Sequence, residues 1–266
     1  MKLQDIYIYP IKSLGGIRLD SAVLEERGLQ HDRRWMLVDA QGRFLSQRSH
    51  PHMALLEVSL RPEGLRVIHK MDVSQSHLVP FVPETDRMIP VTIWDDQVAG
   101  QVVSETAGKW FSERLEMPCE LVMMPEKVRR KVDSTYAENG ETVSYADAMP
   151  FLLIGQASLD ELNGRLKTPV PMNRFRPNLV FSGGTPYVED GWTSIRIGNA
   201  LFKITKPCAR CVLTTVDQDT GKKGKEPLRT LSTYRKFAEK VLFGQNMLLI
   251  EGSTLHIGDP LIPSGM

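Results

Sequence analysis

Short strand-like runs that end at Pro, Gly or Asp are the feature that most limits how this chain can fold. In the first hundred residues they cover 3–13, 33–48, 55–60, 64–68 and 88–93. In the second half they cover 177–182, 193–197, 200–206, 212–216, 246–251 and 253–257. The turn residues between them interrupt any long helical pattern, and short, regularly spaced strands are typical of closed barrels. We therefore predict closed or nearly closed β-barrels instead of an open parallel sheet.

Two stretches have the periodicity of an amphipathic helix. In 103–115, Trp110, Phe111 and Leu115 recur at helical spacing behind Ser104, a suitable N-cap residue. In 156–166, three leucines share one face, and Ser158 or a nearby polar residue is expected to cap the helix. The first helix would separate two β-rich modules, and the basic and polar segment 126–143 would form a linker or mobile loop. The expected fold class is α+β, mostly β with some α.

Composition excludes several classes of protein. The 266 residues include 33 Lys and Arg against 32 Asp and Glu, a balance unlike a disordered tail or a strongly basic nucleic-acid-binding arm. Three cysteines are too few for a disulfide-rich secreted framework, and the N-terminus lacks a signal-peptide pattern. No apolar run approaches the roughly 20 residues of a membrane span. We expect a soluble cytoplasmic protein with neither nucleic acid nor membrane as a partner.

The most distinctive local motif is KPCARCVLTTVDQDTG at 206–221, which places Cys208 and Cys211 on either side of Arg210. A zinc site would need two more ligands, and no second cysteine pair or suitable histidine pair is present. A thiol–disulfide redox pair usually opens a helix, whereas a β-rich run follows here. The remaining interpretations are one thiolate on a soft transition metal, favoured by the arginine, or two buried structural cysteines.

Other polar clusters supply groups that bind anions. Lys12 and Ser13 follow the first strand, Arg33 lies in HDRRWML, and Arg176 and Asn178 flank a proline. Each cluster alone is explained by a solvated surface pair. Together they provide the guanidinium forks and amides that a phosphate and a heteroaromatic ring would require. The basic run 127–131 could close over such an anion, although a solvated loop is its simpler use.

Taken in order, the motifs resemble one known family across nearly the whole chain. They are IYPIKS, HDRRWMLVD, FLSQR, NRFRPNLVFSGG, KPCARCVLTTVDQDTG, EPLRTL, FGQN and HIGDP. This series is similar to the MOSC proteins of the YcbX and mitochondrial amidoxime-reducing component type. The resemblance implies a MOSC-associated N-terminal β-barrel domain at 1–120 and a MOSC β-barrel domain at 121–266.

The resemblance also implies roles for particular residues. Cys211 would be the protein ligand to molybdenum in a Mo-pyranopterin cofactor, and Cys208 a neighbour with a packing role. Contacts to the pterin and its phosphate would come from Lys12, Ser13, Arg33, Arg176, Asn178, Ala209 through its backbone, and Arg210. Asn246 and the segment 147–150, including Asp147, would add further contacts. Asp217 would support catalysis by orienting donors or a coordinated water.

The activity implied by the resemblance is reduction of N-hydroxylated compounds such as hydroxylamines and amidoximes. Three cysteines cannot bind a four-cysteine iron–sulfur cluster beside molybdenum, so electrons are expected from a separate ferredoxin, flavodoxin or reductase. The MOSC domain is also similar to the C-terminal domain of molybdenum-cofactor sulfurases. The alternative is therefore a cofactor carrier or sulfur-transfer protein without turnover of its own.

Overall fold

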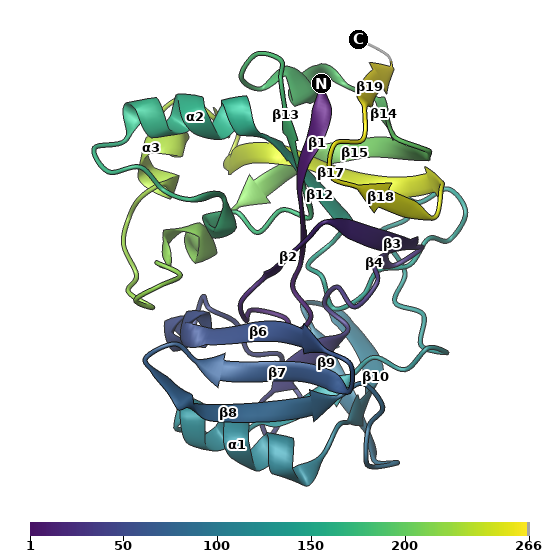
Figure 1. The fold of residues 1–266 in the computed structure, drawn as a ribbon, viewed down its shortest axis with the longest axis vertical. Helices are drawn as coiled ribbons and strands as arrows, with labels where there is room; N and C mark the ends of the chain where they lie inside the picture. Colours follow the sequence, from purple (N-terminus) through teal and green to yellow (C-terminus); the bar gives the residue numbers. More distant parts are fainter. Residues whose placement is uncertain (265–266) are drawn as a thin grey trace.

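The computed structural model describes residues 1–264, and its elements form two halves that are stacked in Figure 1. The lower half contains β5 (Trp35–Val38), β6 (Leu56–Arg61), β7 (Gly64–His69), β8 (Asp72–Pro80), β9 (Met88–Ile93), β10 (Asp96–Val102), β11 (Glu120–Met123) and α1 (Glu105–Leu115). The upper half contains β1 (Lys2–Ile8), β2 (Ile17–Leu19), β12 (Phe151–Gly155), β13 (Leu179–Ser182), β14 (Ser194–Ile197), β15 (Ala200–Arg210), β16 (Lys236–Phe237), β17 (Lys240–Glu251), β19 (Leu261–Ser264), α2 (Gln156–Arg165) and α3 (Leu228–Ser232). A small sheet of β3 (Ser21–Glu25), β4 (Gly28–Leu29) and β18 (Thr254–His256) lies where the halves meet. Short 3-10 helices are η1 (Pro51–Leu55), η2 (Met172–Arg174), η3 (Val188–Gly191) and η4 (Val212–Thr215).

The large sheet of the upper half closes on itself. Its strands follow the order β19-β14-β15-β17-β12-β13-β1-β2, with β16 added to β17. At the far end, Lys2 in β1 bridges Pro260, and the amide of Leu261 donates to the carbonyl of Met1 at 3.0 Å. These bonds join the β1 side of the sheet to β19, so the strands enclose a barrel. The predicted mostly β fold with some α is confirmed.

Alternating apolar residues fill the interior of this barrel. In β1, Leu3, Ile6 and Ile8 are buried. Phe151 and Phe202, on the two strands that flank β17, meet edge to face at 5.2 Å between ring centroids. Burying each such side chain contributes about 1.5–3 kcal/mol. The lower half has its own apolar clusters, between the strands and α1 and on the far side of β5 and β10.

The first strand in the sequence belongs to the upper half. β1 pairs antiparallel with β13, so Leu3 lies opposite Phe181, which is far along the chain. The chain then descends to build the lower half and returns to the barrel at β12. A division into 1–120 and 121–266 stays a prediction, and strands from both segments share the large sheet.

Helix α1 has the predicted position and cap. Ser104 Oγ accepts a hydrogen bond from the Ala107 amide at 3.0 Å, and the helix ends at Glu116, whose φ of +53° is left-handed. Helix α2 also forms where expected, but the predicted Ser158 cap is wrong. Ser158 lies inside the helix, where its hydroxyl donates to Glu189 Oε1 at 2.8 Å.

The strand predicted at 212–216 is also wrong, because the chain forms η4 there. The hydroxyl of Thr214 donates to the Cys211 carbonyl at 3.0 Å, and that of Thr215 donates to the Val212 carbonyl at 2.7 Å. Threonine side chains that bond to the backbone three residues earlier stabilise turns. These local bonds outweigh the strand propensity of β-branched residues.

Candidate functional site

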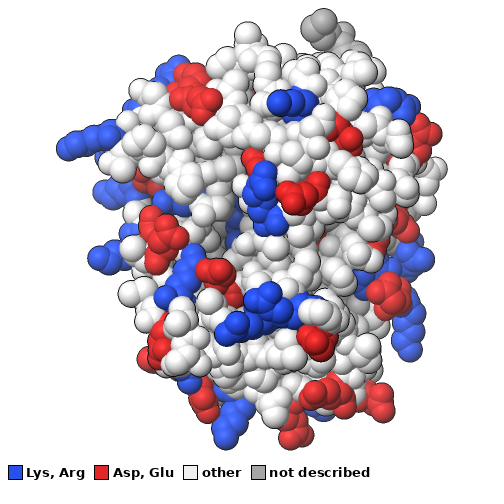
Figure 2. Space-filling view, in the orientation of Figure 1, with Lys and Arg blue, Asp and Glu red and all other residues white. Residues whose placement is uncertain are grey.

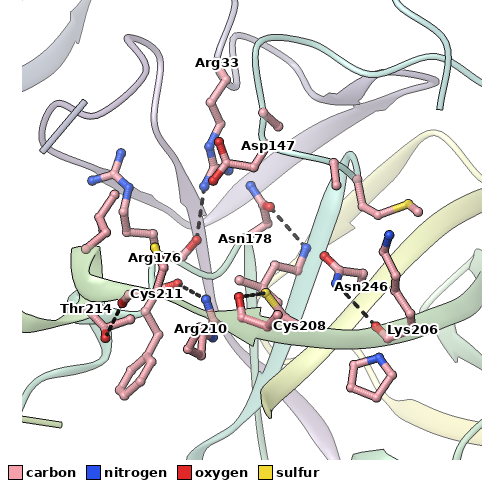
Figure 3. A pocket seen from close by; sticks show the side chains of 18 of the residues that line it. Arg33, Asp147, Arg176, Asn178, Lys206, Cys208, Arg210, Cys211, Thr214 and Asn246 are labelled. Carbon is pink, nitrogen blue, oxygen red and sulfur yellow. Dashed lines mark hydrogen bonds between the residues drawn. The ribbon is translucent and has the colours of Figure 1, made fainter. Parts of the chain in front are cut away.

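A cavity of about 310 Å³ lies between the two halves and is lined by residues from both. It is strongly basic, because eight of its lining residues are Lys or Arg and one is a carboxylate. The basic residues are Lys12, Arg33, Arg48, Arg174, Arg176, Lys206, Arg210 and Lys240, and the acid is Asp147. Figure 3 shows five of these side chains around the end of β15, namely Arg33, Asp147, Arg176, Lys206 and Arg210. Such a concentration of positive charge in a concave site favours an anionic ligand.

Irregular pairing at the end of β15 presents the two cysteines to this cavity. The register between β15 and β17 shifts between Pro207 and Ala209, which leaves Cys208 as a bulge. Cys211 follows the strand in an extended conformation and is exposed, whereas Cys208 is half-buried. Burial raises the pKa of the Cys208 thiol, although nearby Arg210 opposes this shift. Cys211 is therefore the more accessible of the two sulfur atoms.

A stacked aromatic ring fixes two of the arginines. The guanidinium carbons of Arg33 and Arg176 lie 4.3 Å and 4.1 Å from the centroid of the Tyr9 ring. Both arginines have left-handed backbones, with φ of +48° and +54°. A non-glycine residue in this conformation costs about 1–3 kcal/mol and is often found at functional sites. The Tyr9 hydroxyl donates to the Pro177 carbonyl at 3.1 Å, which fixes the ring through its edge.

Two buried guanidinium nitrogens in the cavity wall have no hydrogen-bond partner among the described residues. They are Nη2 of Arg176 and Nη2 of Arg210. Other nitrogens of these side chains donate to backbone carbonyls: Arg176 Nη1 to Leu14, Arg210 Nε to Phe243 and Arg210 Nη1 to Phe175. Burial lowers the pKa of Arg176 to about 10, so it keeps its charge at neutral pH. An unpartnered buried donor is costly, and an anion in the cavity would satisfy both.

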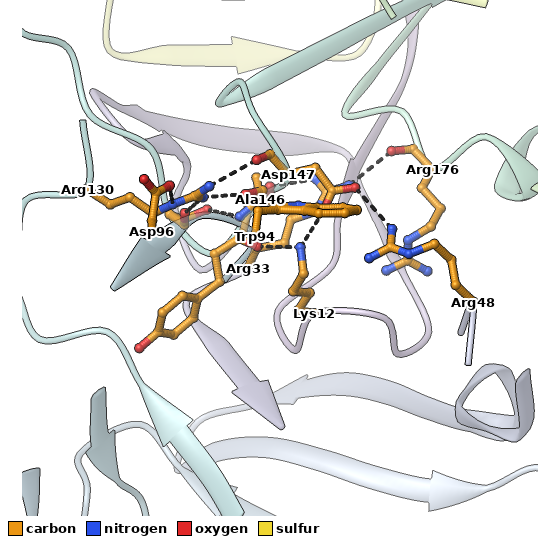
Figure 4. Close-up of polar contacts among 12 residues, drawn as sticks. Lys12, Arg33, Arg48, Trp94, Asp96, Arg130, Ala146, Asp147 and Arg176 are labelled. Carbon is orange, nitrogen blue, oxygen red and sulfur yellow. Dashed lines mark hydrogen bonds and ion pairs between the residues drawn. The ribbon is translucent and has the colours of Figure 1, made fainter. Parts of the chain in front are cut away.

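The carboxylate of Asp147 is surrounded by donors (Figure 4). Lys12 Nζ lies 2.5 Å from Oδ1, the indole nitrogen of Trp94 donates to the same oxygen at 3.2 Å, and Arg48 lies 3.8 Å from Oδ2. Burial would raise the pKa of Asp147, but the two cations and the indole hold it well below its usual range. Burial lowers the pKa of Lys12 to about 8 despite its pairing with Asp147.

Arg130 fixes the segment that carries Asp147. Its Nε donates to Asp96 Oδ2 at 2.7 Å, and its terminal nitrogens donate to the carbonyls of Ser144, Ala146 and Asp147 at 2.9, 2.5 and 3.0 Å. Arg130 belongs to the basic run expected to be a solvated loop or a cover for an anion. Instead this side chain is buried and holds the segment 144–147 in place through its hydrogen bonds.

Ten of the eleven predicted site residues line the cavity. They are Lys12, Ser13, Arg33, Asp147, Arg176, Asn178, Ala209, Arg210, Cys211 and Asn246. Asp217 does not reach it. Its carboxylate accepts hydrogen bonds from the amides of Asp219 and Thr220 in a turn, and pairs with Arg174 at 3.5 Å. A direct catalytic role for Asp217 therefore has no support in this geometry, and its contact with the cavity runs through Arg174.

Sequence reasoning missed four of the basic lining residues: Arg48, Arg174, Lys206 and Lys240. Arg48 ends the FLSQR motif and Lys206 opens KPCARC, so both were within motifs that had been recognised. Arg174 also lies in a recognised motif, NRFRPNLVFSGG. Lys240 carries no local signal, because only the folded chain brings it to the cavity.

The cavity fits a ligand that combines a phosphate with a soft metal centre. The unpartnered guanidinium nitrogens suit the phosphate, and the exposed Cys211 thiol suits the metal. Zinc fits less well, since no three His, Cys, Asp or Glu side chains cluster for metal binding between residues 1 and 264. Within that range, none of the helices has the length and apolar character to cross a membrane.

Most of the chain matches two family models and several known proteins. Residues 1–118 match the model of the MOSC N-terminal beta barrel domain, and residues 140–262 match that of the MOSC domain. The mitochondrial amidoxime-reducing component 1 of Mus musculus is 33% identical over 96% of this chain and 80% of its own length. That of Homo sapiens is 32% identical over 96% of this chain and 81% of its own. The molybdenum cofactor sulfurase of Oryza sativa is 32% identical over 98% of this chain but 35% of its own.

Proposed function

The chain belongs to the MOSC-domain family of the amidoxime-reducing component type, and on that premise we propose that it is a molybdenum-cofactor-dependent reductase of N-hydroxylated compounds. The observation that carries the proposal is one cavity with an accessible thiol, Cys211, and eight basic residues. Electrons come from a separate electron-transfer protein. All three cysteines are free, which suits a reducing compartment such as the cytoplasm.

The reaction is a two-electron reduction. An amidoxime takes up two electrons and two protons, its N–O bond breaks, and an amidine and water are released. The bound cofactor would supply the redox-active metal for this two-electron transfer. Hydroxylamines take up the same two electrons and two protons and give amines and water.

The chain's own residues bind and orient the cofactor. Cys211 would ligate the metal, while Arg176 and Arg210 would donate their unpartnered nitrogens to the phosphate. Asn178 is less available, because its amide group bonds to the backbone of Tyr7 and Leu152. Lys12 is protonated at neutral pH, and its ammonium lies beside Asp147 in the cavity wall. The Lys12 ammonium therefore holds a proton in the cavity wall, whereas Asp147 stays ionised because its pKa is depressed.

The test is the molybdenum content of protein purified from a host that makes the cofactor. We expect close to one molybdenum per chain, retained in Cys208→Ala and lost in Cys211→Ala. The loaded protein should oxidise a chemically reduced viologen dye when benzamidoxime is added. Equal molybdenum in both cysteine variants would refute the ligand assignment, and loaded protein without dye oxidation would refute the reductase.

A cofactor carrier or sulfur-transfer protein is the second candidate, favoured by the 32% identity to the rice sulfurase over nearly the whole chain. A carrier should release its cofactor to a molybdenum-free acceptor enzyme within minutes. A reductase should keep it through repeated turnover.

A further inference from the structure

We propose that the surface next to Cys211 is the docking site for an acidic electron-carrier protein. This inference rests on the proposed function, which requires electrons from outside the chain. We call the surface the Cys211 face and define it by Val212, Lys222, Lys225, Lys236 and Phe237. All five side chains are exposed.

Sheet register places Phe237 close to Cys211. Strand β17 lies between β15 and β16. Its residue Val241 pairs with Arg210 of β15 on one side and with Lys236 of β16 on the other. One step further along, Lys240 pairs with Phe237, and Cys211 continues β15 with φ −123° and ψ −179°. Cys211 and Phe237 therefore flank Lys240 at about two strand spacings, roughly 10 Å between backbones.

Phe237 is the apolar anchor of this face. It is 76% exposed at the tip of the β16–β17 hairpin, and Val212, directly after Cys211, is 42% exposed. A large aromatic side chain in water beside a cofactor cavity serves no packing purpose within the chain. Exposed aromatics surrounded by polar residues are typical of the centre of a protein interface.

Within the part of the chain that the structure describes, the side of this face next to η4 carries unpaired positive charge. Lys222 and Lys225 lie in a loop held against η4, where the Gly224 amide donates to the Thr215 carbonyl at 3.0 Å. Neither lysine has a carboxylate within 4.0 Å among the described residues. Figure 2 shows Lys and Arg side chains projecting along the left flank, where Figure 1 places α3 and the loop below it.

The acidic residues of this region are already paired. Asp219 lies 3.4 Å from Lys70, Glu226 lies 2.8 Å from Arg229, and Glu239 lies 3.5 Å from Lys236. An approaching protein would therefore meet a net positive surface, which accelerates association with an acidic partner. A small contact of this kind suits a carrier that must bind and leave, as electron-transfer complexes do. A one-electron carrier would dock twice for each substrate reduced.

The experiment compares two electron sources on the cofactor-loaded chain. One source is a reduced viologen dye, which needs no docking site, and the other is an acidic [2Fe–2S] ferredoxin kept reduced by its reductase. The variants are Phe237→Ser and the pair Lys222→Glu with Lys225→Glu. Matched controls on the lower half are Val82→Ser and Lys109→Glu, which are also exposed.

We expect the KM for ferredoxin to rise about fivefold in Phe237→Ser and about tenfold in the double lysine variant, with dye-driven rates unchanged. Ferredoxin affinity for the cofactor-free chain, measured by calorimetry, should fall by the same factors and weaken with salt. Unchanged ferredoxin affinity in both variants, or equal losses in the controls, would overturn the docking site. Failure of the dye reaction in the wild type would instead overturn the proposed function.

Discussion

Lys12 Nζ and Asp147 Oδ1 lie 2.5 Å apart, in an ion pair that joins the loop after β1 to the segment before β12. Trp94, at the tip of the β9–β10 hairpin, donates to the same carboxylate oxygen. Three segments that are distant in the sequence therefore meet at one carboxylate. The pair connects the two halves of the protein in the wall of the cavity.

Asp147→Asn should lower the free energy of unfolding at pH 7 by about 2 kcal/mol, because it leaves the buried Lys12 ammonium without its counterion. The pKa of Asp147 is depressed in the folded state. Its stabilisation is therefore complete above the ordinary carboxyl pKa near 4 and is lost as the pH falls below it. Urea titrations at pH 7, 5 and 3.5 should show the difference between wild type and variant shrinking with acid. A constant difference across this range would contradict the assignment.

Sulfate binding to the cofactor-free cavity should weaken as the pH rises through about 8, because Lys12 then loses its proton. The arginines that line the cavity keep their charge over this range. We expect a several-fold loss of sulfate affinity between pH 7 and pH 9, measured by calorimetry. Lys12→Arg should bind sulfate almost equally at both pH values. If that variant loses affinity as steeply as the wild type, another group is titrating.

Arg130→Met should destabilise the protein by about 3 kcal/mol, because it removes four hydrogen bonds from a buried guanidinium. Its neighbour Arg129 is a matched control, since its ion pair with Glu26 is exposed. Arg129→Met should change the unfolding free energy by less than about 0.5 kcal/mol. Denaturant titrations of both variants measure the two changes in unfolding free energy. Similar changes would show that the hydrogen bonds of Arg130 do not stabilise the protein.

Gly244→Ala should cost about 3 kcal/mol, because its φ is +80° and an added Cβ would lie 2.8 Å from the Leu153 carbonyl oxygen. Gly164, near the end of α2, offers the opposite case, with nothing within 4 Å of an added Cβ. Gly164→Ala should stabilise the protein by about 0.5 kcal/mol through helix propensity. Thermal melts of the two variants should shift in opposite directions, and shifts of the same sign would be inconsistent with these local environments.

The sequence predicts those structural features that interactions between residues close in the chain determine. Ser104 marks the start of α1 because a hydroxyl cap acts within three residues. The 212–216 segment was misassigned because its valines and threonines have strand propensity, while the hydroxyl bonds that form η4 leave no periodic pattern. Ser158 was misread as a cap because its partner, Glu189, lies 31 positions away.

The candidate site was predictable where its residues lie in recognisable motifs, as Cys211 and Arg176 do. Arg130 shows the limit, because nothing in a run of basic residues distinguishes the one that becomes buried. Its partners, from Asp96 to Asp147, are set by the tertiary fold. The contact of Trp94 with Asp147 could not be predicted for the same reason.

The pairing of β1 with β13 has a consequence for the order in which the protein folds during synthesis. Leu3 is synthesised nearly 180 residues before its partner Phe181. In the interval the lower half, whose strand pairs are mostly between near neighbours in the chain, can complete its contacts. Strand β1 can pair early with β2 on one edge, but its other edge must wait for β13. This unpaired edge makes the nascent barrel the stage most exposed to misassembly.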